Sequence, residues 1–392
     1  MAEVVILSAA RTPIGRFLGG FATTPAPRLG AAAIRAALER AGVGPPQVDQ
    51  VIMGNVLSAG VGQAPARQAG LGAGLPDTVP ATTVNKVCGS GLQAVVLAAQ
   101  AIRTGDAEVV VAGGMENMSL APYLLDRARA GFRLGHATVF DSMLRDGLHD
   151  AYTDLHMGQC CELLNREYRF TREEQDAYAA ESYRRALAAM NTGAFADELV
   201  PVEVAQPKGP PGVVDADEEP RRVDFDRLPS LPPAFDPQGS VTAANASKIS
   251  DGAAALVVAS ADVAARLERR PLARIVGAAG AAGAPEWFTI QPAAAIRRLL
   301  ERVGWTLDEV DLFEINEAFA SVVLAVTRDL GVGTERVNVH GGAVALGHPI
   351  GASGARILTT LLHALRRRGG RRGVAAICLG GGEALALAVE RI

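Results

Sequence analysis

The sequence lacks long apolar runs, has few cysteines and shows no excess of one charge. No apolar segment reaches the roughly 18 residues that a transmembrane helix needs, so we expect no membrane partner. The 38 basic and 42 acidic residues leave a net charge of -4, which argues against a basic face for nucleic acid. Four cysteines in 392 residues cannot form a disulfide framework, so each needs its own explanation.

What is present is typical of a large folded protein. Hydrophobic residues make up 49% and charged residues 20% of the chain, which suits an extensive buried interior. At about 150 residues per domain, the length predicts two or three domains. The opening VVILSAAR is typical of a buried strand, with no signal or transit segment before it. We therefore expect a cytoplasmic location, where thiols stay reduced.

Short β-rich runs alternate with Ala-rich helical stretches in the first third of the chain. Residues 29–41 and 91–103 have helical periodicity, whereas residues 48–56 and 109–112 are typical of strands. This alternation predicts an α/β fold with a mostly parallel sheet and helices on its faces.

Residues 119–247 interrupt this alternation. They hold more charge and 10 of the 22 prolines, with a predicted helix at 171–190 and a Pro- and acid-rich loop at about 207–237. We therefore expect a large excursion from the α/β core. The predicted domains are an N-terminal half of residues 1–118 with 248–270, a loop domain of residues 119–247 and a C-terminal half of residues 271–392.

The two ends of the chain resemble each other. Three segments recur in the same order, which favours duplicated halves related by a pseudo-twofold axis over chance likeness between α/β stretches. The paired segments are 48–57 with 310–319, 84–102 with 337–365, and 109–117 with 374–384.

Cys88 lies at a predicted strand-to-helix turn, in VCGSGLQAVV. A thiol at a helix N-terminus lies near the positive end of the dipole, so we expect its pKa to be lowered towards the reactive range. Gly89 and Gly91 leave room for a substrate beside the sulfur and the backbone N–H groups. The alternative, a small buried apolar residue, stays open from this motif alone.

A nucleophilic cysteine needs a base, and HGGAVALGHPIGASGAR offers two histidines in a Gly-rich segment before a helix. Pro349 restricts the backbone of His348, which makes His348 the better candidate. His340 is the weaker candidate and is also consistent with a hydrogen-bonded spacer.

A second thiol, Cys378, follows the strand VAAI and precedes three glycines, at the carboxyl end where open α/β sheets bind ligands. Asn316 and Glu317 also follow a strand, where capping of the next helix is the plainer interpretation. Cys160 and Cys161 are adjacent, lack metal-ligand spacing and are interpreted as packing residues.

Several motifs together resemble the thiolase family over residues 5 to 388, essentially the whole chain. The resemblance implies duplicated βαβ halves in a five-layer αβαβα arrangement with an inserted loop domain. The chain length and HMG favour the short-chain biosynthetic branch. The motifs are SAARTPIGRFLG, VNKVCGSGLQAV, HMG, TAANASKISDGAAA, NEAFA, GGAVALGHPIGASGAR and CLGGG.

The resemblance also implies a ping-pong Claisen condensation of two acetyl-CoA molecules into acetoacetyl-CoA and CoA. Cys88 would form an acetyl-enzyme with activation by His348, and Cys378 would remove the α-proton of the second acetyl-CoA. One oxyanion hole would be His348 with a water held by Asn316. The other would be the backbone N–H groups of Cys88 and Gly380.

Coenzyme A thioesters would be substrates, with no further cofactor and no metal. Some positions depart from the family pattern: His340 replaces an Asn, Phe288 replaces a Met of the acyl pocket, and Glu383 interrupts a Gly-rich segment. Cys160 and Cys161 replace small polar residues. By resemblance, the residues along the substrate and CoA are His156, Met157, Arg221, Ser247, Phe288, Ala318 and Phe319.

Two other functions remain open at this point: a degradative 3-ketoacyl-CoA thiolase for longer chains, and a non-catalytic protein that binds CoA esters. A ketoacyl synthase is disfavoured, because its second-step group is usually His or Asn where this chain has Cys378. Family members are commonly homotetramers or homodimers, and the segment around 119–140 is a candidate contact.

Overall fold

The structure, a computed structural model, describes residues 2–206 and 209–392. Pro207 and Lys208, at the start of the predicted Pro- and acid-rich loop, lie outside the described residues. Within the described residues, ten strands form one mixed sheet, and two short hairpins lie apart from it.

The ten-stranded sheet consists of two halves with the same strand pattern. From the centre outwards, each half has two antiparallel pairings followed by a parallel one. The central strands β1 and β11 pair antiparallel and join the halves, which confirms the predicted duplication. The first half contains β1 (Val4–Arg11), β10 (Ser250–Ser260), β5 (Val109–Asn117) and β3 (Gln50–Gly54), and the second contains β11 (Ala273–Ala282), β14 (Glu383–Glu390), β13 (Arg372–Leu379) and β12 (Leu312–Ile315).

The prediction of a mostly parallel sheet was wrong. In the sheet, the parallel pairings among the described residues are β3–β5, β12–β13 and β3 with the edge strand β4 (Ala81–Val84). β13 returns directly as β14 through a three-residue turn, and a hairpin connection always gives antiparallel strands. β10 comes after the long excursion, and a connection of that length allows the strand to enter the sheet either parallel or antiparallel to its neighbours.

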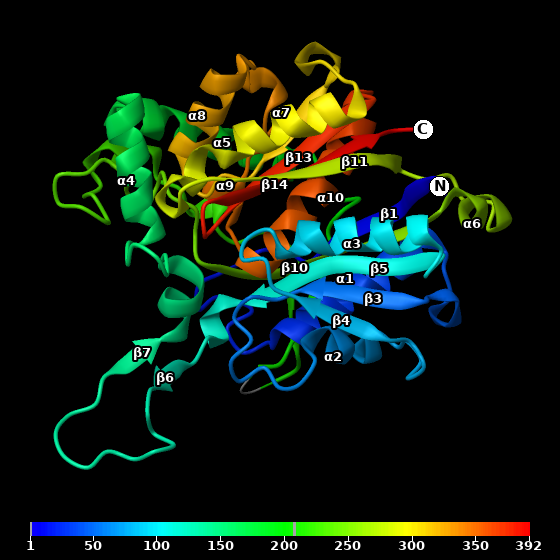
Figure 1. Ribbon diagram of the computed structural model, residues 1–392, viewed down its shortest axis with the longest axis horizontal. Coiled ribbons are helices and arrows are strands. Elements are labelled where there is room, and N and C mark those ends of the chain that lie inside the picture. The colour runs from blue at the N-terminus through cyan, green and yellow to red at the C-terminus, as the bar shows by residue number, and fades with distance from the viewer. Residues whose placement is uncertain (1, 207–208) are drawn as a thin grey trace.

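Helices complete five layers (Figure 1). α3 (Ser90–Thr104) and α10 (Ile350–Arg368) pack on each other between the two sheet halves. α1 (Ala26–Ala41) and α2 (Pro65–Gly72) cover the first half, and α7 (Gln291–Val303) packs on β11 and β14 beside α8 (Ala320–Leu330). α10 is buried from Ile350 to Leu365, polar residues such as Arg356 and Thr359 included, and its exposed charged residues lie in the last turn at Arg366, Arg367 and Arg368.

α3 and α10 approach each other closely because glycines lie at the contact. A Cβ added to Gly354 would lie 2.4 Å from the backbone nitrogen of Leu92, and one added to Gly91 would lie 2.8 Å from that of Ala355. In the chain, α3 comes directly after the loop that holds Cys88, and α10 comes directly after the loop that holds His348. This contact therefore sets the distance between those loops.

The segment between β5 and β10 forms separate elements on the outside of the core, including a hairpin that projects from the molecule (Figure 1). The domain boundaries at 118–119 and 247–248 stay a prediction. The remaining helices and strands are β2 (Gly15–Arg16), β6 (Tyr123–Leu125), β7 (Val139–Asp141), α4 (Met157–Tyr168), α5 (Arg172–Asn191), β8 (Val202–Val204), β9 (Gly212–Val214), α6 (Ala261–Arg266) and α9 (Ala343–Leu346). Short turns of 3-10 or π-helix lie at η1 (Pro45–Gln47), η2 (Met118–Leu120), η3 (Leu144–Leu148), η4 (Pro220–Arg222), η5 (Phe225–Ser230), η6 (Pro285–Ile290), η7 (Leu307–Glu309) and η8 (Thr334–Arg336).

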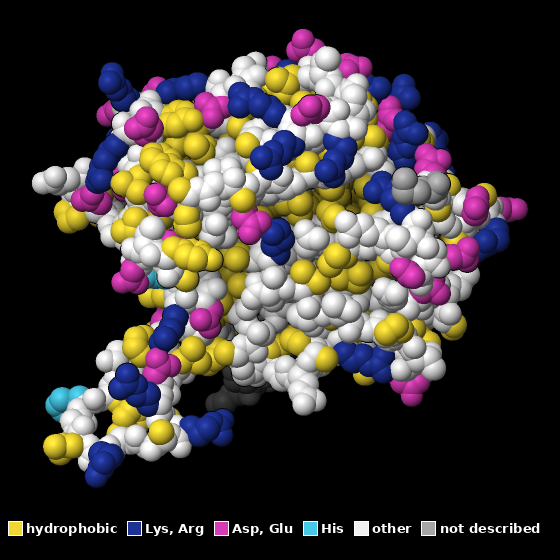
Figure 2. All heavy atoms as spheres, viewed as in Figure 1, with side chains coloured by type: hydrophobic (Ala, Val, Ile, Leu, Met, Phe, Trp, Pro, Cys, Tyr) yellow, Lys and Arg dark blue, Asp and Glu magenta, His cyan; other side chains and the backbone are white. Residues whose placement is uncertain are grey.

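The visible surface carries acidic and basic side chains interspersed rather than gathered by sign (Figure 2). Over the described ranges, no helix combines the length and apolar character that crossing a bilayer requires.

Candidate active site

One cavity brings together three residues from distant parts of the chain. Its volume is about 390 Å³, and its lining includes Cys88, His348 and Cys378. Cys88 lies in the turn between β4 and α3, His348 between α9 and α10, and Cys378 near the end of β13. Of the other predicted site residues, the cavity wall includes His156, Met157, Ser247, Phe288, Ala318, Phe319 and Gly380.

The turn that presents Cys88 is held by its own side chains. The Lys86 N–H donates to Ser90 Oγ at 2.8 Å, and the Ser90 hydroxyl donates to the Val87 carbonyl at 2.6 Å. Val87 has φ of 46°, a left-handed conformation that is strained for a β-branched residue. Strain of this kind concentrates at functional turns, and here it immediately precedes the candidate nucleophile.

The expectation of a lowered pKa for Cys88 was wrong. Burial raises the pKa of Cys88 to about 12, while the backbone N–H groups of Gly380 and of Cys88 itself act in the opposite direction. Desolvation of the thiolate outweighs the favourable N–H groups at the helix start. Cys88 is therefore a neutral thiol at rest, and its reaction requires a base.

His348 is held in one orientation and one tautomer. Its Nδ1 lies 2.6 Å from Ser353 Oγ, and the Ser353 hydroxyl donates to the Pro349 carbonyl at 2.9 Å. Because that hydroxyl proton is already engaged, Nδ1 carries the proton and donates to Ser353. His348 Nε2 therefore carries the lone pair and accepts a long hydrogen bond from Asn316 Nδ2 at 3.4 Å. Burial, with a smaller effect of Arg356, lowers the pKa of His348 to about 3, so the ring is neutral.

Sequence reasoning missed Ser353. It lies in GASGAR, one turn into α10, and a serine there is equally consistent with helix packing. The signal available was its position five residues after the candidate base.

Cys378 is almost fully buried, with 1% of its surface exposed. Burial raises the pKa of Cys378, and the nearby Cys88 raises it further. The two sulfurs therefore lie close enough to interact electrostatically, and both are neutral thiols at rest. Cys160 and Cys161 are fully buried within the apolar core beside the cavity, as the packing interpretation predicts.

Asn316 and Glu317 do not cap α8, because the residue before that helix is Phe319 and makes no side-chain capping bond. Asn316 is buried beside His348, and its Oδ1 has no hydrogen-bond partner within the described residues. Glu317 accepts hydrogen bonds from the hydroxyls of Tyr178 and Ser182 at 2.8 and 2.7 Å. It also accepts one from the backbone N–H of Val344 at 3.0 Å, which anchors the loop leading to His348.

Of the residues predicted to lie along the CoA, His156 lines the cavity and Arg221 does not. His156 precedes α4, where its Nδ1 accepts the Gly158 N–H at 2.9 Å, and its ring stacks on Phe235. Burial lowers the pKa of His156 to about 4, so this ring is also neutral. Arg221 is exposed on η4 and does not line the cavity, although Glu219 does.

Lys248 is a cavity residue that had no predicted role. Its Nζ donates to the carbonyls of Ala243 and Ala246 at 2.6 and 2.9 Å, and its backbone carbonyl accepts the His348 N–H at 3.0 Å. Burial lowers the pKa of Lys248 to about 8. The sequence feature that could have identified Lys248 was its position within the motif TAANASKISDGAAA.

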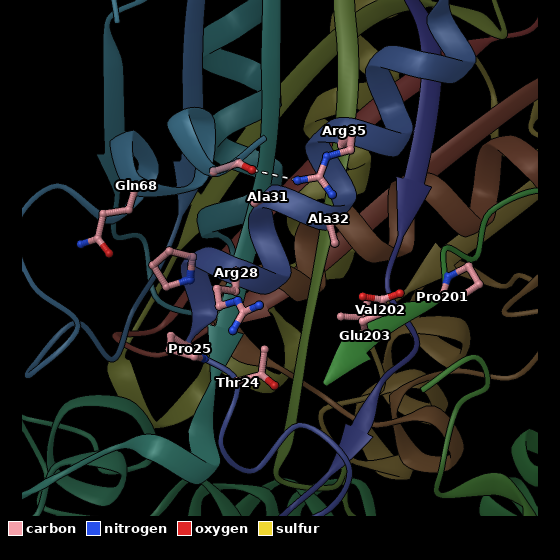
Figure 3. A pocket seen from close by; sticks show the side chains of 12 residues that line it. Thr24, Pro25, Arg28, Ala31, Ala32, Arg35, Gln68, Pro201, Val202 and Glu203 are labelled. Atoms are coloured by element: carbon pink, nitrogen blue, oxygen red, sulfur yellow. Dashed lines mark hydrogen bonds between the residues drawn. The ribbon is translucent and has the colours of Figure 1, made fainter. Parts of the chain in front are cut away.

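A cavity of about 710 Å³ lies elsewhere, between α1 and β8, and contains none of the predicted site residues (Figure 3). Arg28 and Arg35 line it from one helix, and Glu203 faces them from β8. Across residues 2–206 and 209–392, no group of three His, Cys, Asp or Glu side chains is arranged to hold a metal ion.

Fold and cavity together define the class of protein: an α/β protein of two duplicated halves that places two thiols and a neutral imidazole around one apolar cavity. The thiolase N-terminal domain matches residues 4–262, and the thiolase C-terminal domain matches residues 269–391. The chain belongs to the thiolase family.

Relatives in bacteria and plants match this chain over its full length. It is 55% identical over 392 residues to an acetyl-CoA acetyltransferase of Pseudomonas aeruginosa, which covers 100% of both chains. It is also 55% identical to acetyl-CoA acetyltransferase 1 of Arabidopsis thaliana, covering 99% of this chain and 94% of the relative. The crystal structure of the Bacillus anthracis acetyl-CoA acetyltransferase superimposes with a TM-score of 0.98 at 44% identity, covering 100% of this chain and 99% of that one.

Proposed function

We propose that this protein is an acetyl-CoA C-acetyltransferase, which reversibly converts two acetyl-CoA molecules into acetoacetyl-CoA and CoA. The observation that carries the proposal is the shared cavity of Cys88, His348 and Cys378. The names of the full-length relatives support the same activity. No cofactor beyond the CoA thioesters is part of the proposal.

In the first half-reaction, the Cys88 sulfur attacks the acetyl carbonyl while its proton passes to His348 Nε2. Both groups are neutral at rest, so proton transfer accompanies the attack. The C–S bond to CoA then breaks, and the leaving sulfur takes that proton back from His348. The products are acetyl-Cys88, a neutral His348, the Cys378 thiol and free CoA.

In the second half-reaction, Cys378 passes its proton to His348 and, as the thiolate, removes the α-proton of a second acetyl-CoA. The resulting carbon attacks acetyl-Cys88, the C–S bond to Cys88 breaks, and His348 returns its proton to that sulfur. All three groups regain their starting protonation. Oxyanions would be stabilised by the N–H groups of Cys88 and Gly380 and by a water between His348 and Asn316.

The cavity also favours short acyl chains. Phe288 is 3% exposed and contributes an aromatic ring to a wall that also contains Met157 and Phe319. Thiolysis rates of 3-ketoacyl-CoAs of four to ten carbons test this, and we expect the rate to fall steeply after four carbons. Phe288→Met should extend the accepted length. A flat or rising profile in the unmodified protein would favour the degradative activity.

A non-catalytic CoA-ester-binding protein is separated from the proposal by mass spectrometry of the intact protein. Incubation with acetyl-CoA should add one acetyl group to the unmodified protein and to Cys378→Ala, but none to Cys88→Ala. Cys378→Ala should nevertheless fail to produce acetoacetyl-CoA. Loss of acetylation in Cys378→Ala would contradict its role as the second-step base.

We further propose a cytoplasmic homotetramer or homodimer. The four cysteines are free thiols, which suits a reducing compartment. The projecting hairpin exposes Tyr123, Leu134 and Val139 by 68%, 99% and 55%, and side chains of this kind favour a protein contact.

A further inference from the structure

An ion pair joins the two turns that hold Cys88 and Gly380. Lys86 Nζ lies 2.5 Å from Glu383 Oε2, across 297 positions of sequence. Lys86 precedes Cys88 by two residues, and Glu383 follows Gly380 by three. The resemblance to the family assigns no role to either side chain, so the pair is an observation on this structure alone.

Each turn is held by its own contacts: the Ser90 hydroxyl donates to the Val87 carbonyl, and Leu379 pairs with Glu383 across β13 and β14. The Cys88 turn contains the strained Val87, and the other turn contains Gly381 and Gly382 at φ of 84° and 78°. The two turns meet in apolar contacts, since a Cβ added to Gly89 would lie 2.5 Å from Leu379 Cδ2 and one added to Gly380 would lie 3.4 Å from Val87 Cγ1. Apolar contacts are non-directional and do not by themselves aim the backbone N–H groups. Yet an oxyanion hole made from the N–H groups of both turns works only if the two donors converge on one oxygen.

We propose that the Lys86–Glu383 ion pair holds these two turns in register, so that both residues are positioning residues for acyl transfer. The inference rests on the proposed function and adds to it a determinant of the oxyanion hole. Neither side chain lines the catalytic cavity; both line a separate surface groove beside β11. They therefore act through the backbone of the turns and not on the substrate.

The effect should appear in turnover and not in stability. The Lys86 and Glu383 side chains are 29% and 39% exposed, and pairs of this kind contribute little to folding. Misalignment of one donor should cost less than its removal, which is worth about 10²- to 10³-fold in rate. We expect kcat to fall about tenfold when the pair is broken, with KM for acetoacetyl-CoA nearly unchanged.

The test is a set of charge variants assayed at saturating acetoacetyl-CoA and CoA. Lys86→Met and Glu383→Gln should each lower kcat about tenfold, and the double variant Lys86→Met with Glu383→Gln should be no worse than either single variant. The swap Lys86→Glu with Glu383→Lys should recover most of the kcat that Lys86→Glu loses. The matched control is Arg266→Met, which breaks an exposed ion pair outside the cavity lining and should leave kcat unchanged. In that pair, Arg266 Nη2 lies 2.6 Å from Glu108 Oε2.

Salt gives a second readout, because screening weakens an exposed ion pair. At about 1 M NaCl, kcat of the unmodified protein should approach that of Lys86→Met, whereas kcat of Lys86→Met should change little. Unchanged kcat in both neutral variants, at melting temperatures equal to the unmodified protein, would overturn the inference.

The two proposals fail separately. If the unmodified protein does not cleave acetoacetyl-CoA, the proposed function fails, and the ion pair is then tested through the alkylation rate of Cys88. Breaking the pair should change that rate, since Gly380 N–H interacts with the Cys88 sulfur. An identical alkylation rate in Lys86→Met and in the unmodified protein would overturn the positioning role on its own.

Discussion

Burial decides the protonation state of each reacting side chain. The thiols of Cys88 and Cys378 are neutral because a thiolate loses its hydration in the cavity, and His348 is neutral because an imidazolium would do the same. A neutral thiol beside a neutral base avoids a standing ion pair in an apolar site. In the proposed reaction, charge develops only as bonds form and break, and the N–H groups of Cys88 and Gly380 and a water held by Asn316 would stabilise it.

The first prediction concerns the reactivity of Cys88. Because burial raises the pKa of Cys88 to about 12, its thiolate fraction should rise about tenfold per pH unit from pH 7 to pH 10. Iodoacetamide labelling, followed by peptide mass spectrometry, should therefore show a slope near one without a plateau. Acetyl-CoA should protect Cys88, and the buried Cys160 and Cys161 serve as unlabelled internal controls. A plateau near neutral pH would contradict the raised pKa.

The second prediction concerns Ser353. Ser353→Ala removes the acceptor that holds the proton on His348 Nδ1, so the ring is free to rotate or to change tautomer. We expect kcat to fall about 10- to 100-fold with little change in KM. Thr359→Val is the matched control, since it removes a buried hydroxyl of the same helix that bonds only the Ala355 carbonyl. Equal effects of the two variants would reduce Ser353 to a packing residue.

Among the elements, the backbones of β5 and of the start of α10 approach each other closely. A Cβ added to Gly114 of β5 would lie 2.0 Å from the carbonyl oxygen of Gly351. Glu116, two residues further along β5, accepts the Gly351 N–H at 2.9 Å. The position of His348 therefore depends on a strand that contributes no side chain to the reaction.

The third prediction follows from this contact. Gly114→Ala should lower the free energy of unfolding by about 2 kcal/mol or more, because a backbone atom cannot move aside as a side chain can. Turnover should fall with it as α10 shifts His348. Gly280→Ala in β11 is the control, since its added Cβ meets nothing nearer than 3.5 Å. Thermal unfolding and kcat, measured together, check both effects, and a stable, fully active Gly114→Ala variant would contradict the argument.

For the whole molecule, the projecting hairpin of β6 and β7 is the feature that the single chain does not explain. Its exposed Tyr123 and Leu134 gain nothing from the chain's own core. We expect the Tyr123→Ser, Leu134→Ser double variant to form a smaller oligomer than the unmodified protein, as measured by light scattering after gel filtration. Phe225→Ser, which alters an exposed aromatic residue outside the hairpin, should leave the mass unchanged. An unchanged mass for the double variant would exclude the hairpin as a subunit contact.

The sequence by itself determined which main segments are helices and strands, that the halves are duplicated, and which residues are candidates for the reaction. Local periodicity, turn glycines and the motifs around Cys88, His348 and Cys378 hold that information, because each depends on near neighbours in the chain. Strand direction was not determined in this way, since β10 joins the sheet after a long excursion and its pairing depends on distant segments.

Only the tertiary structure decided the electrostatics and the supports of the site. The pKa of Cys88 depends on how much water the assembled cavity excludes, and this outweighs the helix start that the local sequence suggested. Ser353 and the Lys86–Glu383 pair became recognisable only when folding brought their partners within hydrogen-bond distance. Desolvation and long-range pairing are properties of the packed chain, so no short stretch of sequence contains them.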